Sequence, residues 1–134
     1  MMSYFKEFRL HTEKEGAYNI TSQISDAISE SSIENGIVLI FCPHTTAGLI
    51  ITENTDHAVT SDLLFGMKSA FPDHKEYKHS EGNSFAHIKS SVTGCQLTII
   101  IDGGWHTLGP WQGIFFMEFD GPRERRYQVK IIEC

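Results

Sequence analysis

The chain is poor in cysteine and lacks a long apolar run, and these two absences exclude several classes of protein. Its three cysteines, Cys42, Cys95 and Cys134, lie far apart, and none belongs to a Cys-x-x-Cys pair. This spacing predicts neither a thiolate zinc site nor a disulfide framework. No stretch approaches the roughly 20 apolar residues of a membrane span, and residues 1–10 lack the apolar core of a signal peptide. We therefore expect a cytoplasmic protein with no membrane partner.

Basic residues are also scarce. The 134 residues include 11 Lys and Arg against 17 Asp and Glu, which gives a formal net charge of −6. General nucleic-acid binding requires a basic face, so no nucleic-acid partner is expected. The one basic cluster is local and fits either a phosphate site or a solvated strand face: Arg123, Arg125, Arg126 and Lys130.

Apolar residues, 40% of the total, are spread along the whole chain, which indicates a single domain over residues 1–134 with a packed core. Hydrophobic periodicity predicts three helices: one that begins at Thr21 or Ser22 and stops at Asn35-Gly36, one capped by Asp56 or Thr60, and one over 86–92. Strands are predicted over 4–10, 37–42, 49–52, 96–101, 111–119 and 126–132. This order favours an α+β fold with a largely antiparallel sheet system.

Three histidines, His44, His79 and His87, lie in polar segments that a bare core would not need. Neutral imidazole is the commonest metal ligand among side chains, and three imidazoles with nearby carboxylates are typical of a catalytic divalent metal. Each histidine taken alone is better explained as a surface or hydrogen-bonded residue. The eight-residue separation of His79 and His87 also matches no zinc-protease or zinc-finger spacing. Taken together, beside Thr, Glu and Asn, they favour a shared metal site.

Further polar residues admit two interpretations each. Glu53 is either a general acid/base near the metal or part of a strand-to-helix turn. Arg123 follows the Asp120-Gly121-Pro122 turn, where a guanidinium can bind phosphate or pair with a surface carboxylate. The glycine-rich segment 102–112 can offer N–H groups to phosphate, or simply form two tight turns beside Trp105 and Trp111.

Several motifs together resemble the YjbQ family, whose members are described as secondary thiamine-phosphate synthases. The resemblance covers nearly the whole chain, and its combined motif set is highly specific. One departure is visible, since Pro110 stands where the family usually has threonine. The motifs are Pro43-His44-Thr45-Thr46-Ala47, Glu53-Asn54, His79 with Glu81, Ala86-His87, Leu108-Gly109-Pro110-Trp111-Gln112, and Glu118-Phe119-Asp120-Gly121-Pro122-Arg123.

The resemblance implies a compact β-sandwich, a homotrimer, and a pocket in which His44, His79 and His87 bind a divalent metal. Zinc is favoured because it suits neutral imidazoles, with nickel, cobalt and manganese as other options. The implied reaction joins a hydroxymethylpyrimidine diphosphate to a thiazole phosphate and releases pyrophosphate. Glu53 and Glu81 are the candidate proton carriers. The candidate substrate and phosphate contacts are Thr45, Asn54, Asn83, Trp111, Gln112 and Arg123.

Two other functions remain open at this stage. One is metal-assisted hydrolysis of a small phosphorylated metabolite, and the other is non-catalytic binding of a metal or ligand. Turnover of a phosphorylated substrate in the presence of metal would separate the two enzymes from the binding protein.

Overall fold

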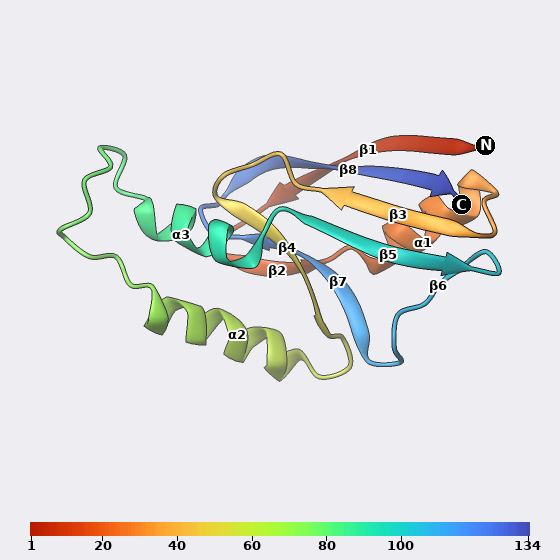
Figure 1. Cartoon of the computed structure of the whole chain (residues 1–134). Coiled ribbons are helices and arrows are strands. Elements are labelled where there is room, and N and C mark those ends of the chain that lie inside the picture. Colours follow the sequence, from red (N-terminus) through yellow and green to blue (C-terminus); the bar gives the residue numbers. More distant parts are fainter.

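Alternating apolar residues build two antiparallel sheets, and three helices pack against them (Figure 1). The computed structural model describes all residues from Met1 to Cys134. The α+β class predicted from the sequence is confirmed. In chain order the elements are β1 (Ser3–Thr12), β2 (Gly16–Asn19), α1 (Thr21–Ser31), β3 (Gly36–Phe41), β4 (Ala47–Glu53), α2 (His57–Ala70), α3 (Ser84–Thr93), β5 (Gln96–Asp102), β6 (Trp105–His106), β7 (Gln112–Glu118) and β8 (Arg123–Glu133).

The main core lies between the two sheets. Five strands form one sheet in the order β1-β8-β3-β5-β6, and three form the other in the order β2-β7-β4. Val38 and Ile40 of β3 point inward with Val129 and Ile131 of β8, and all four are fully buried. Ile24 and its apolar neighbours on α1 join the same cluster, together with residues of β4 and β7. The expected β-sandwich is therefore present, with α1 packed into it.

A second, smaller apolar layer covers the other face of β7. Phe115, Met117 and Phe119 point away from the main core and pack with Ala86 of α3. Residues Leu63, Leu64 and Met67 of α2 complete this layer. Because β7 is buried on both faces, its sequence is a continuous apolar run rather than an alternation.

The helix ends show which local signals the sequence predicted correctly. Asp56 caps α2, and its side chain accepts a hydrogen bond from the Ala58 N–H at 2.9 Å. The predicted cap of α1 was wrong, because Asn19, not Thr21 or Ser22, accepts from the first-turn N–H. That helix also ends earlier than expected, since Ser32 adopts a left-handed conformation with φ of 60°.

Two strands, β2 and β6, were not predicted, because four and two residues are too few to show a periodic pattern. The polar segment 71–83 between α2 and α3 is irregular and leads into α3. None of the three helices combines the length and the apolar character that crossing a membrane requires.

The five-stranded sheet also has an outward face with apolar side chains. Phe5 of β1 lies in register with Lys130 of β8, which in turn lies opposite Leu39 of β3. Phe5 and Ile100 are 57% and 61% exposed on this outer face. A monomer therefore leaves apolar surface open to water on this side.

Candidate functional site

A polar cavity of about 400 Å³ opens where four segments meet. These are the loop after β3, the end of segment 71–83, the start of α3 and the first residues of β8. Seven of the residues selected from the sequence line it: His44, Thr45, His79, Glu81, Asn83, His87 and Arg123. The remaining lining residues are Pro43, Thr46 and Arg125. The structure thus brings all three histidines to one cavity.

The other four selected residues lie elsewhere in the chain. Glu53 is opposite Gln112 in the β4–β7 register, and the Asn54 N–H donates to the Trp111 carbonyl at 2.7 Å. The extended β4 strand begins beside the cavity at Ala47 and carries Glu53 about 20 Å along its axis. The expectation that Glu53, Asn54, Trp111 and Gln112 join the histidines is therefore not met within one chain.

These four residues have contacts of their own. The side-chain oxygen of Gln112 accepts from the Gly109 N–H at 2.8 Å, which closes the turn around Pro110. Asn54 accepts from the Asn19 amide at 2.6 Å, and a Cβ on Gly113 would meet the Asn54 side chain at 2.6 Å. These contacts give the motif a structural role at the far end of the three-stranded sheet.

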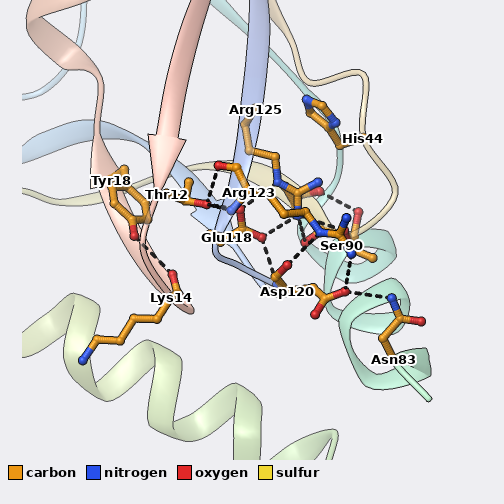
Figure 2. A network of polar contacts seen from close by, with 12 residues as sticks. Thr12, Lys14, Tyr18, His44, Asn83, Ser90, Glu118, Asp120, Arg123 and Arg125 are labelled. Carbon is orange, nitrogen blue, oxygen red and sulfur yellow. Dashed lines mark hydrogen bonds and ion pairs between the residues drawn. The ribbon is translucent and has the colours of Figure 1, made fainter. Parts of the chain in front are cut away.

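A buried ion pair forms one wall of the cavity (Figure 2). Arg125 is 5% exposed and Glu118 is fully buried. The Arg125 Nε donates to Glu118 Oε1 at 2.7 Å, and its Nη2 donates to the Thr46 hydroxyl at 2.9 Å. Thr12 of β1 donates a further hydrogen bond to Glu118 at 2.6 Å. Four segments of the chain therefore meet at this pair.

Burial raises the pKa of Glu118, but hydrogen bonds from Arg125 and Thr12 outweigh it and hold the pKa below its usual range. The carboxylate is therefore ionised at neutral pH and compensates the buried guanidinium. The sequence analysis placed Arg125 in the local basic cluster and Glu118 in a family motif, but it did not pair the two residues. The available signal was Glu118 itself, a lone carboxylate within the apolar run 114–119.

A second arginine lies at the cavity rim. Arg123 donates through Nη2 to the Asp120 carboxylate at 3.0 Å, and Asn83 donates to the same carboxylate at 2.8 Å (Figure 2). Burial raises the pKa of Asp120, but these hydrogen bonds lower it by more than burial raises it, so this carboxylate is also ionised at neutral pH. Each arginine is thus fixed by a carboxylate, and neither uses its Nη1 in a hydrogen bond within the chain.

His44 is held as a neutral ring. His44 Nε2 lies 3.0 Å from the Arg126 backbone nitrogen and 3.1 Å from the Arg126 carbonyl oxygen, so the Arg126 backbone holds this edge of the ring. Burial and the nearby Arg125 charge lower the pKa of His44, which agrees with a neutral imidazole. His79 and His87 face each other edge to face, with ring centroids 5.2 Å apart.

The donor set is of the right kind for a divalent metal, but its members do not converge. No group of three His, Cys, Asp or Glu side chains is arranged to hold an ion. His44 Nε2 lies against the Arg126 backbone, and a nitrogen that binds a metal needs a free lone pair. The side chains of His79, His87 and Glu81 have no comparable bond to the backbone, so His44 is the most constrained of the candidate ligands.

The buried ion pair predicts a defined pH dependence of stability. Glu118→Gln leaves the Arg125 charge buried without compensation and should lower the free energy of unfolding by about 3 kcal/mol at pH 7. Because folding depresses the Glu118 pKa from 4.5, its contribution is present above pH 4.5 and is lost as pH falls further. Urea denaturation across this range should show a shallower acid loss in the variant than in the wild type.

The exposed Glu7–Arg126 pair, at 3.1 Å, supplies the control. Glu7→Gln should change stability little, since exposed ion pairs contribute little. Equal effects of the two substitutions would contradict the central role of the buried pair.

Two curated proteins are similar to this chain over most of its length. A UPF0047 protein of Methanocaldococcus jannaschii is 50% identical over 127 residues, which are 94% of this chain and 92% of that protein. The YugU protein of Bacillus subtilis, also a UPF0047 protein, is 42% identical over 90% of this chain and 92% of its own length.

Solved structures agree with this relationship. A conserved YjbQ/UPF0047 protein of Clostridium acetobutylicum superimposes with a TM-score of 0.93 at 48% identity, covering 95% of this chain and 99% of that one. A protein of unknown function from Sulfolobus solfataricus gives a TM-score of 0.94 at 30% identity, with 98% of both chains covered. The family model described as "UPF0047 protein YjbQ-like" matches residues 6–134. The chain belongs to this YjbQ-like UPF0047 family.

Proposed function

We propose that the cavity binds the phosphate or diphosphate group of a small phosphorylated metabolite. The observation that carries this proposal is the pair of arginines, Arg123 and Arg125, at one polar cavity. Each guanidinium donates through Nε and Nη2 to Asp120 or Glu118, which orients it and leaves the N–H groups of Nη1 for a ligand oxygen. Because the net charge of −6 does not attract anions, the proposal rests on this local arrangement of donors and not on the overall charge.

The family resemblance extends the proposal to a thiamine-phosphate synthase-like transfer. A bond forms between the pyrimidine methylene carbon and the thiazole nitrogen, while the bond from that carbon to the pyrophosphate oxygen breaks. Arg123 and Arg125 would stabilise the negative charge that develops on the leaving pyrophosphate. Glu81, which lines the cavity, is the carboxylate placed to exchange a proton there, whereas Glu53 of the same chain is too distant.

Substitution of either arginine by lysine tests the anion site. Arg123→Lys and Arg125→Lys should each weaken binding of phosphate and pyrophosphate by roughly ten- to a hundredfold, because a single ammonium cannot hold the carboxylate as two guanidinium nitrogens do and also donate to the anion. Isothermal titration of both anions against each protein measures the effect.

Arg126→Lys is the matched control, because Arg126 pairs with Glu7 on the surface and does not line the cavity. It should leave both affinities unchanged. Equal affinities in all four proteins, including the wild type, would remove both arginines from the site.

We further propose that His44, His79 and His87 bind one divalent ion, with zinc favoured for neutral imidazoles. Support comes from the shared cavity and from the edge-to-face pairing of His79 with His87. His44 would take part through Nδ1, or through Nε2 after release of the Arg126 backbone. When bound, the ion would supply a positive charge and polarise a phosphoryl oxygen.

Metal analysis of the purified protein decides this point. Wild type should contain close to one zinc per chain, and each His→Ala variant should lose most of it. His57, an exposed residue at the start of α2, provides a control whose alanine variant should keep its metal. Unchanged metal content in all three cavity variants would exclude the site.

We also propose that the chain assembles as a homotrimer. The exposed apolar side chains on the outer face of the five-stranded sheet support self-association, since a partner would cover them. Light scattering at micromolar concentration should give three times the 15.1 kDa mass of one chain. A monomer at that concentration would contradict the proposal.

A further inference from the structure

Two of the three cysteines lie opposite each other where strands β3 and β5 meet. Phe41 is the last registered residue of β3 and pairs with Gln96, the first residue of β5. The next pair in the same antiparallel register is Cys42 with Cys95, and the Cys42 N–H donates to the Cys95 carbonyl at 2.7 Å. In Figure 1 this position is the end of β3 beside the beginning of β5. The two residues are 53 apart in sequence, and the fold alone makes them neighbours.

The backbone geometry of such a pair suits a disulfide. Directly opposed residues of an antiparallel pair have Cα atoms about 5.5 Å apart when they are hydrogen-bonded. Cα separations of about 4.4–6.8 Å are those found across disulfides. Opposed side chains also point to the same face of the sheet, so both thiols leave the backbone on one side. The pair lies one position beyond the last registered pair of the β3–β5 ladder. Fewer ladder hydrogen bonds hold the backbone there, so a small backbone shift can bring the two sulfur atoms together.

Access to the pair comes from one side only. Cys42 is buried at 1% exposure, whereas Cys95 is exposed. Cys95 lines a second groove of about 360 Å³, together with His44, Thr45 and His87. An oxidant of small size can therefore reach Cys95 through this groove, while Cys42 is shielded by the core.

We infer that Cys42 and Cys95 form a site of reversible oxidation, which a peroxide converts to a cross-strand disulfide. The Cys95 thiolate attacks the peroxide, an S–O bond forms as the O–O bond breaks, and water leaves after protonation. The Cys42 sulfur then attacks the resulting sulfenic acid, the S–S bond forms, and a second water leaves. Two thiols and one hydrogen peroxide thus give one disulfide and two waters, and a dithiol reductant reverses the change.

This disulfide would join two walls of the phosphate cavity. Cys42 directly precedes the Pro43-His44 loop, and Cys95 follows Gly94 at the end of α3, the helix that carries His87. The inference does not depend on the proposed function, because it rests on the β3–β5 register and on the accessibility of Cys95.

The test uses the full chain carrying Cys134→Ser, which removes the remaining exposed thiol. Brief treatment with hydrogen peroxide, followed by alkylation and intact mass measurement, should show the loss of two hydrogens and no alkylated thiol. Peptide mapping should link the Cys42 peptide to the Cys95 peptide, and dithiothreitol should restore both thiols. A second variant with Cys95→Ser should keep Cys42 as a free thiol after the same treatment.

Three results would overturn the inference. These are oxidation of Cys95 to sulfinic acid without a link to Cys42, a disulfide only between two chains, and the recovery of both thiols unchanged. Circular dichroism before and after treatment shows that the fold is intact, so a link formed in unfolded protein is recognised and counts against the inference.

Discussion

The buried ion pair between Arg125 and Glu118 is the interaction on which the site depends. It joins β8 to β7, reaches the loop before β4 through Thr46, and takes a hydrogen bond from Thr12 at the end of β1. Two charges removed from water are stable only when they compensate each other and their remaining hydrogen-bonding groups are satisfied. That requirement fixes the position of Arg125 beside the cavity, and the cavity takes its shape from the segments that the pair holds together.

Much of the fold could be predicted because its signals are local. The Asp56 cap and the apolar strand predicted over 111–119 each depend on a few adjacent residues. The ion pair could not be predicted in this way, because Glu118 and Arg125 meet only after the 119–122 turn sets the β7–β8 geometry. The cap of α1 failed for a related reason: Asn19 accepts the bond from its position at the end of β2, a strand too short to recognise.

The candidate site shows the same division. His79, Glu81, Asn83 and His87 line the same cavity because a single loop-to-helix segment carries them. Glu53 and Trp111 were grouped with them by motif. In the structure the extended strand β4 places Glu53 at the end away from the cavity, a distance that a sequence motif does not reveal. The sequence thus indicated which residue types could bind a ligand. Which of these polar residues share one cavity could be known only from the sheet register.

Burial of β7 on both faces has a consequence for how the cavity can respond to a ligand. Glu118 ends a strand enclosed by two apolar layers, so we expect opening of this wall to disrupt both layers and its amides to exchange slowly with solvent. The opposite wall carries His79 on segment 71–83, where turn bonds such as Tyr77 N–H to His74 O replace a regular ladder. Because few regular backbone bonds hold this segment, we expect it to open locally more readily than the Glu118 wall. If an anion binds the arginines, we expect the histidine segment, and not the Glu118 wall, to adjust around it.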